Sequence, residues 1–271
     1  MLNLCVAGAA GRMGVAIIQE ARAKGILTVG ATEAPAGPMT ALRTPTIGKT
    51  LRQLGITDQD TVIQSSDNLE YALKNADVFI SFTAPAADLV NVPIAVNLGK
   101  RIVLGTTGFT PEQNRQVTSA MSGKVPAVFS PNYSVGVNIL FKLAEQLRAF
   151  PEGYDFSINE IHHTGKKDAP SGTAKKLGEI VATVRGYTQT VSGREGISPR
   201  QPHELEITSL RAGGVAGIHD LIVAGPNEML RIEHTAFSRN VFAQGAVCAA
   251  EWLSKQNEPK VYTMADVLGL T

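Results

Sequence analysis

Short apolar runs alternate with helical patterns through residues 1–130, and this alternation constrains the fold more than any other feature of the sequence. The apolar runs are rich in branched side chains and are expected to be strands: residues 2–7, 26–32, 78–82, 102–104 and 127–129. Helical patterns lie between them at residues 13–24, after Pro85 and at residues 111–121, where Thr110 can act as the cap. Such alternation predicts crossover connections and a mostly parallel sheet.

The pattern changes after about residue 130. A long amphipathic segment at residues 137–150 is followed by an alternating segment at residues 154–161. Three more strand candidates then come in series with hardly a helix between them: residues 204–211, 219–224 and 229–237. Strands joined by short turns are typical of an antiparallel or mixed sheet with one open face, so we expect a second domain.

The sequence therefore predicts an α/β protein with two domains. Residues 1–130, completed by a final helix and tail at residues 240–271, are expected to form a Rossmann-type dinucleotide-binding domain with a parallel sheet. Residues 131–239 are expected to form an α+β domain with an open mixed sheet. A length of 271 residues is sufficient for two hydrophobic cores.

Composition narrows the range of functions. The chain has 25 Lys plus Arg against 24 Asp plus Glu, so no basic field indicates nucleic acid, and small molecules are the favoured partners. The two cysteines, Cys5 and Cys248, lack metal-ligand spacing, which favours a reduced, cytoplasmic context. The sequence contains no apolar run of membrane-spanning length, and its apolar start lacks the basic region of a signal peptide.

The turn GAAGRMG at residues 8–14 follows an expected strand and opens an expected helix. In that context glycines let the backbone approach a pyrophosphate, whose charge then meets free N–H groups at the helix N-terminus. The residues expected to contact a dinucleotide at this turn are Gly8, Gly11, Arg12, Met13 and Gly14. The spacing is GxxGxxG instead of GxGxxG, and a glycine-rich turn without a ligand is the alternative.

An acidic residue, Glu33, stands about twenty residues beyond the glycines, where a carboxylate can accept hydrogen bonds from an adenosine ribose. The next residue is Ala34, so no arginine stands beside the carboxylate to pair with a 2′-phosphate. We therefore predict a nicotinamide cofactor, NADH or NADPH, with NADH used at least as well as NADPH. The alternative is that Glu33 is a solvated acidic residue in a loop and binds no ribose.

Two further strand ends carry polar residues. SFTAP at residues 81–85 and GTTG at residues 105–108 should line the nicotinamide and substrate crevice, because ligands of open parallel sheets bind outside the carboxyl ends of the strands. The alternative is that both segments are ordinary turns that bind no ligand.

The most polar stretch is EIHHTGKKDAPSGTA, residues 160–174. His162 and His163 at a strand end would point to opposite sides, which disfavours a shared metal ion, so no metal is expected. Histidine titrates near neutrality and a partly enclosed lysine can have a lowered pKa, so His162 and Lys166 are suited to donate the proton that accompanies a hydride. Asp168 could hold the loop or pair with a lysine.

The second half of this stretch has the features of a helix start. Ser171 or Thr173 can cap a helix over residues 174–184. Free N–H groups of Ser171, Gly172 and Thr173 would form an anion cradle, with His163 and Lys166 beside it. The expected ligand is a small anion that carries carboxylates or phosphates.

These segments resemble the 4-hydroxy-tetrahydrodipicolinate reductase family of the diaminopimelate and lysine pathway. The family pattern of Glu, one residue, His, His, two residues, Lys, one residue and Asp-Ala-Pro-Ser-Gly-Thr-Ala is filled by residues 160–174. GxxGRMG at residues 8–14, Phe-Thr-x-Pro at 82–85, GTTG at 105–108 and SPNYSVGVN at 130–138 are also similar to the family.

The resemblance implies roles for individual residues. His162 would be the proton donor or its close partner, and Lys166 would supply the catalytic proton. The substrate carboxylates would be bound by His163, Lys166, Ser171, Gly172, Thr173 and, from the cofactor domain, Thr107. Further cofactor contacts would come from Phe82, Thr83, Gly105, Thr107, Ser130, Asn132 and Tyr133.

The resemblance also implies a reaction and an assembly. NADH or NADPH would reduce the cyclic imine formed from 4-hydroxy-tetrahydrodipicolinate, and the partners would be a small dicarboxylate and three further copies in a homotetramer built through the second domain's sheet. Thr164 and Gly165 depart from the family, in which these two positions are often basic or His, so accessory contributions to the positive pocket are expected to be missing. The competing hypotheses are another two-domain dehydrogenase that acts on a small carboxylate, and a dinucleotide sensor without catalysis.

Overall fold

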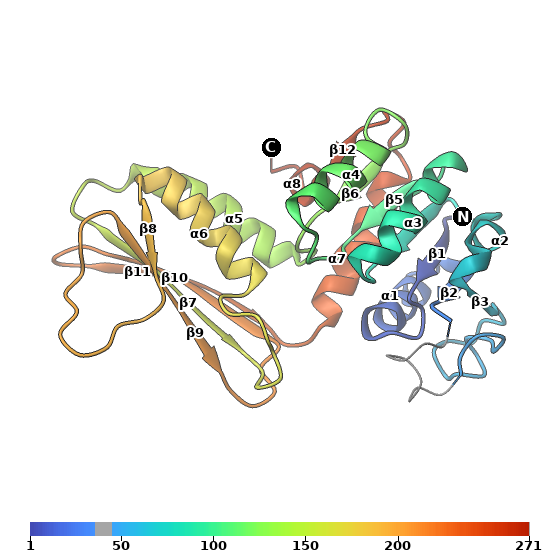
Figure 1. Cartoon of the computed structure of the whole chain (residues 1–271), viewed down its shortest axis with the longest axis horizontal. Coiled ribbons are helices and arrows are strands. Elements are labelled where there is room, and N and C mark those ends of the chain that lie inside the picture. The colour runs from blue at the N-terminus through green and yellow to red at the C-terminus, as the bar shows by residue number, and fades with distance from the viewer. Residues whose placement is uncertain (36–44, 271) are drawn as a thin grey trace. The chain divides into compact units, whose positions relative to one another are not determined.

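The computed structural model describes residues 1–35 and 45–270. The chain divides into two compact units: unit 1 comprises Met1–Tyr133 and Phe242–Thr271, and unit 2 comprises Ser134–Val241 (Figure 1). Among the described residues, no helix has the length and apolar character needed to cross a membrane.

Unit 1 is built on a parallel sheet with the strand order β12-β6-β5-β4-β1-β2-β3. Every pairing along that order is parallel, as the alternation of strands and helices predicts. The strands are β1 (Asn3–Ala7), β2 (Leu27–Glu33), β3 (Ile63–Ser65), β4 (Val78–Ser81), β5 (Arg101–Leu104), β6 (Ala127–Phe129) and β12 (Val261–Tyr262). The order reverses at β1, which makes the carboxyl end of β1 the switch point where doubly wound sheets bind ligands.

Helices cover both faces of this sheet, because alternate residues of each strand supply a different core. In β1, Leu4 and Val6 pack with α1 and α7, whereas Cys5 and Ala7 pack with α2, α3 and α4. The helices are α1 (Arg12–Ala23), α2 (Leu69–Leu73), α3 (Pro85–Asn97), α4 (Pro111–Met121), α7 (Asn240–Leu253) and α8 (Met264–Val267), with a 3₁₀ turn η1 (Ser66–Asn68). The predicted cap is confirmed, since Thr110 forms a capping box with Gln113.

Unit 2 contains a mixed sheet with the order β11-β10-β7-β9-β8. Pairings β7–β9 and β8–β9 are parallel, and β10 is antiparallel to both β7 and β11. The strands are β7 (Asp155–His162), β8 (Gln189–Val191), β9 (Glu204–Arg211), β10 (Gly217–Ala224) and β11 (Met229–Ala236). The predicted fold class, a parallel-sheet domain joined to an α+β domain with a mixed sheet, is therefore confirmed.

Two helices, α5 (Val135–Gln146) and α6 (Gly172–Arg185), pack on one face of the unit 2 sheet, and a 3₁₀ turn η2 (Leu147–Ala149) follows α5 (Figure 1). Even-numbered residues of β7 point to this covered face, among them the buried Phe156 and Ile158, while odd-numbered residues lie on the other face and are partly exposed. This alternation decides which polar residues of β7 are removed from water.

Candidate active site

The glycine turn of unit 1 has no room for additional side chains. Gly8 adopts a φ of +66°, and a Cβ on Gly14 would lie 2.1 Å from the carbonyl oxygen of Gly8. Helix α1 can therefore approach β1 closely only with glycine at this position. The residue before α1 is Gly11, which has no side chain to cap the helix. This leaves a helix N-terminus open to an anionic group such as a pyrophosphate.

The carboxylate of Glu33 lies beside the glycine turn. Its Oε2 accepts a hydrogen bond from the backbone N–H of Ala10 at 3.1 Å, and its Oε1 accepts one from Ala34 at 3.3 Å. Glu33 therefore occupies a fixed place at the end of β2. This position is the one that a ribose-binding carboxylate takes in dinucleotide-binding folds.

The ends of β4 and β5 lie next to each other and to the glycine turn. A Cβ on Gly8 would lie 3.0 Å from Cγ2 of Thr83, and the N–H of Thr83 donates to Oγ1 of the buried Thr106 at 2.8 Å. Thr83 and Thr107 are exposed at these strand ends. Gly105 is needed because its Cβ would lie 2.1 Å from the ring of Phe82.

A buried carboxylate supports the loop after β4. Asp88 is fully buried in α3 and accepts hydrogen bonds from Oγ of Ser81 at 2.5 Å and Oγ1 of Thr83 at 3.3 Å. Burial raises the pKa of Asp88 above its usual value, although the hydroxyl donors oppose this shift.

In the segment from Ser130 to Tyr133, Pro131 is exposed and the other three residues are buried. Ser130, Asn132 and Tyr133 are all buried, and Oγ of Ser130 donates to the carbonyl of Asn132 at 2.8 Å. The hydroxyl of Tyr133 lies 2.9 Å from the carbonyl oxygens of Leu104 and Val128, and burial raises its pKa well above the usual value. The side chain of Tyr133 therefore belongs to the core, and the predicted cofactor contact of this residue is left to its backbone.

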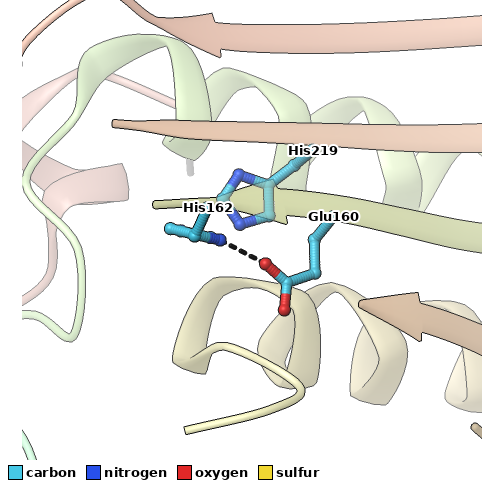
Figure 2. Close-up of side chains that lie close together, drawn as sticks. All are labelled: Glu160, His162 and His219. Carbon is cyan, nitrogen blue, oxygen red and sulfur yellow. Dashed lines mark hydrogen bonds and ion pairs between the residues drawn. The ribbon is translucent and has the colours of Figure 1, made fainter. Parts of the chain in front are cut away.

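In unit 2, β7 ends with two polar residues on its covered face. Glu160 is fully buried and His162 is 8% exposed, and Nδ1 of His162 lies against Oε2 of Glu160. His219 on the neighbouring strand β10 faces the same place, and its ring stands edge-on to that of His162, 5.1 Å between centroids (Figure 2). His163 is the next residue and is less buried, as the predicted alternation requires.

The charges of this cluster differ from residue to residue. Burial alone would raise the pKa of Glu160, but hydrogen bonds, led by that from His162, outweigh burial and lower this pKa to about 2. Burial, with a smaller contribution from the charge of His162, lowers the pKa of His219 to about 4. At neutral pH, Glu160 is therefore ionised and His219 is neutral.

The loop after β7 carries the predicted lysine. Nζ of Lys166 pairs with Oδ1 of Asp168 at 2.8 Å, and the lysine side chain is 20% exposed. Arg211, at the end of β9, holds this loop by donating to the carbonyl oxygen of Asp168 at 2.6 Å. Lys167 is exposed, which agrees with a solvated surface charge.

Ser171 caps α6, as predicted, but its N–H is not the free group that was expected. Its N–H donates to Oε1 of Glu160 at 3.2 Å, so this group is not free to bind an anion. Its side chain caps α6 by accepting from the N–H of Ala174 at 3.1 Å, and it also lies 3.1 Å from Nε2 of His219. The prediction of an anion cradle that includes the Ser171 N–H is therefore wrong for that group. Gly172 is exposed at the start of α6, and Thr173 follows it.

Four functional candidates were missed by reasoning from the sequence: Glu160, Arg211, His219 and Arg239. Glu160 precedes His162 by two residues in a strand, a spacing that places both on one face. Arg239 lies 3.4 Å from Nε2 of His163. It places a guanidinium beside His163, on the loop that also carries Lys166.

Within the described chain, Glu160, His162 and His219 offer possible metal-ligand atoms that lie within 4.8 Å of one another. Both oxygens of Glu160 already accept hydrogen bonds, and one of the donors is the cation of Arg211 at 3.1 Å. A second cation on the same carboxylate would be repelled. The cluster is therefore better suited to holding protons than to binding a metal ion.

The fold and the two groups of residues define a class of protein. A parallel sheet with an open glycine turn and a ribose-type acid at its switch point is the arrangement of a dinucleotide-binding domain. The separate α+β unit carries titratable and cationic side chains suited to proton donation and to small anions. Together they define a two-domain oxidoreductase.

Comparison with known proteins gives the family. The family described as "Dihydrodipicolinate reductase, N-terminus" matches residues 2–133, and "Dihydrodipicolinate reductase, C-terminus" matches residues 136–268. The chain belongs to the dihydrodipicolinate reductase family. Unit 1 is accordingly the dinucleotide-binding domain of a reductase.

Relatives match along the whole chain. The chain is 44% identical to the 4-hydroxy-tetrahydrodipicolinate reductase of Methanosarcina barkeri and 39% identical to that of Trichlorobacter lovleyi, with 100% of both chains covered in each case. A solved structure, dipicolinate-bound dihydrodipicolinate reductase from Paenisporosarcina sp. TG-14, is similar in fold with a TM-score of 0.73 and 24% identity. The match covers 98% of this chain and 99% of that one.

Proposed function

We propose that this chain uses NADH or NADPH to reduce 4-hydroxy-tetrahydrodipicolinate, through its dehydrated cyclic imine, to tetrahydrodipicolinate and water in diaminopimelate and lysine biosynthesis. The observation that carries the proposal is the arrangement at the end of β7. An ionised Glu160 contacts His162 there, and the following loop presents Lys166 and His163. Family membership over the whole chain supports the same reaction.

The residues of unit 1 fit a dinucleotide. The close approach of α1 to β1 that Gly8 and Gly14 permit, the uncapped start of α1 and the fixed carboxylate of Glu33 are suited to a pyrophosphate and a ribose. The residues that would hold the cofactor are Gly8, Gly11, Arg12, Met13, Gly14, Glu33, Phe82, Thr83, Gly105 and Thr107, with backbone groups of Ser130 and Asn132. When bound, the nicotinamide supplies a hydride. Because no cation stands at Ala34, we propose that NADH is used at least as well as NADPH.

The residues of unit 2 supply the proton and bind the substrate. Lys166 would give the proton that accompanies the hydride, with His162 as donor or close partner. His163, Lys166 and Arg239 would bind carboxylates by charge, and Gly172 and Thr173 would bind them at the start of α6. Ser171 would contribute by capping α6, since its N–H is used by Glu160. Thr107 is proposed as a further contact from unit 1.

Each unit has a proposed task. Unit 1 binds the cofactor, and unit 2 binds the substrate and forms a homotetramer through its open sheet. Two exposed apolar residues of β11, Met229 at 64% and Leu230 at 42%, are consistent with a covered sheet edge in the assembly.

We propose a cytoplasmic location, because the two cysteines, Cys5 and Cys248, are free thiols.

The competing functions are a different small-carboxylate dehydrogenase and a dinucleotide sensor. The decisive assay adds enzymatically generated 4-hydroxy-tetrahydrodipicolinate to the protein with NADH or NADPH and follows the absorbance of the reduced cofactor. Loss of absorbance that depends on the substrate supports the proposal. Cofactor binding without substrate-dependent oxidation would favour the sensor, and oxidation only with another carboxylate would favour the other dehydrogenase.

A further inference from the structure

Glu160 is the most buried charged group of unit 2 that the proposed reaction does not use. Its side chain is 0% exposed, and each of its oxygens has a defined set of donors. Oε1 accepts from the N–H of Ser171 at 3.2 Å and from the guanidinium of Arg211 at 3.1 Å. Oε2 faces Nδ1 of His162.

The two donors on Oε1 fix the orientation of the carboxylate. A backbone N–H and a guanidinium cannot act as acceptors, so they hold Oε1 where it is. Oε2 then faces His162, and the hydroxyl of Ser209 is a further donor to the carboxylate. Because an ionised carboxylate only accepts hydrogen bonds, the group that faces Oε2 has to be an N–H.

We propose that Glu160 is a positioning residue that keeps the ring proton of neutral His162 on Nδ1, so that Nε2 is the atom that takes up and gives the catalytic proton. This inference rests on the proposed function for the role of His162. The other ring nitrogen, Nε2, lies beside Gly217, where a Cβ would come within 3.1 Å of it, so glycine at this position keeps a side chain away from Nε2.

The neighbours of the pair support this role. Arg211 binds Glu160 and also the carbonyl oxygen of Asp168, so one side chain fixes both the acid and the loop that carries Lys166. His219 packs edge-on against His162, and its low pKa of about 4 keeps it neutral beside an imidazole that must gain a positive charge.

The substitution Glu160→Gln gives a sharp test. The carbonyl oxygen of the glutamine would stay with the two fixed donors, Ser171 N–H and Arg211, and its NH₂ would turn to His162. Nδ1 would then have to accept, which moves the ring proton of the neutral imidazole to Nε2. The variant therefore inverts the tautomer of His162 while it keeps the shape of the side chain.

Nitrogen NMR of protein labelled with ¹⁵N-histidine measures the tautomer directly. The chain has only 5 histidines, and loss of signals in His162→Gln identifies those of His162. We expect an Nδ1–H tautomer in the unaltered protein and an Nε2–H tautomer in Glu160→Gln. An Nε2–H tautomer in the unaltered protein would overturn the proposal, and that outcome depends neither on substrate nor on the folding of Glu160→Gln.

Kinetics give the second readout. In Glu160→Gln we expect kcat to fall by about 10- to 100-fold with KM changed by less than about threefold. An unchanged kcat would overturn the proposal.

Asp220→Asn is the matched control. Asp220 is also a buried carboxylate, 2% exposed, and it accepts from Arg231 at 2.9 Å and from Asn159 at 3.1 Å, but it faces the other side of β7 and β10 and touches no histidine. We expect its kcat and the His162 tautomer to match those of the unaltered protein. If the unaltered protein fails to reduce the proposed substrate, the proposed function is lost, while the tautomer of His162 still decides the role of Glu160.

Discussion

The two units build their sites from different parts of the chain. In unit 1 the site is mostly backbone: the close packing of α1 on β1 at Gly8 and Gly14, the uncapped start of α1, and Glu33 hydrogen-bonded to the N–H of Ala10. In unit 2 the site is made of side chains, with the charge of Glu160 and the ring of His162 at its centre.

This difference determines how each site can fail. A site made of closely packed backbone is damaged by added atoms, and changes of charge near it have small effects. A site made of buried, titratable side chains keeps its shape after many substitutions but loses its chemistry when one charge or proton is removed. Substitutions in the two units should therefore differ in the size and kind of their effects.

Gly14→Ala should have the largest effect. The new methyl would lie 2.1 Å from the carbonyl oxygen of Gly8, so α1 must move, at a cost of about 3 kcal/mol in the free energy of unfolding. We expect calorimetry to detect no NADH binding, while the histidine NMR signals of unit 2 stay in place. Gly25→Ala is the control: its φ of +73° is strained for alanine, but nothing lies within 4 Å, so NADH should still bind. Normal NADH affinity in Gly14→Ala would contradict the steric account.

Lys166→Ala and His162→Gln should each lower turnover without weakening cofactor binding. A lost general acid lowers turnover by roughly 100- to 10,000-fold, whereas cofactor affinity should be nearly unchanged because both residues belong to unit 2. Stopped-flow measurement of NADH oxidation, paired with NADH titration, separates the two quantities. Lys167→Ala is the matched control, since that lysine is exposed and its removal should leave turnover close to normal. Wild-type turnover in Lys166→Ala would refute its role.

His219→Gln should change how stability depends on pH. In the unfolded chain His219 takes up a proton below its ordinary pKa of 6.5, but the folded protein keeps it neutral down to about pH 4. Acidification through this range therefore favours unfolding, and between pH 7 and 5 this residue should account for a loss of about 2 kcal/mol. Urea titrations at both pH values should show a smaller loss in the variant. The lowered pKa of Glu160 acts in the same direction but between 4.5 and about 2, outside this interval.

Ala34→Arg should have the smallest effect. A guanidinium beside Glu33 would pair with the 2′-phosphate of NADPH, so we expect the ratio of kcat/KM for NADPH to that for NADH to rise about tenfold. Ala34→Gln, which adds bulk without charge, serves as the control. An unchanged ratio in Ala34→Arg would mean that the 2′-phosphate binds elsewhere.

The longer elements could be predicted from the sequence because their patterns repeat several times. The helix at residues 111–121 and the strand at 204–211 have the predicted bounds. Strands β3, β8 and β12 were not predicted, because two or three residues are too few to establish a period of two. Their place in the sheets depends on pairing with neighbouring strands that the rest of the sheet already holds in position.

The part of the candidate site that depends on the spacing of residues along one strand could be predicted from the sequence. The alternation along β7 correctly separates His162 from His163. The contacts of Glu160 with Arg211 and His219 depend instead on strand register, which pairs Glu160 with His219 and His162 with Arg211. That register is set by the packing of the whole sheet, so no local pattern specifies it.

The alternation along β7 has an evolutionary consequence. Its even positions place Glu160 and His162 under α5 and α6, and its odd positions place Asn159 on the other face. Inserting or deleting one residue within the strand would exchange these two sets, exposing the acid and histidine and burying residues of the opposite face. Point substitutions can therefore adjust either face separately, whereas a change of length would abolish the chemistry at once. Lineages of this protein should tolerate indels in its loops far more readily than in this one strand.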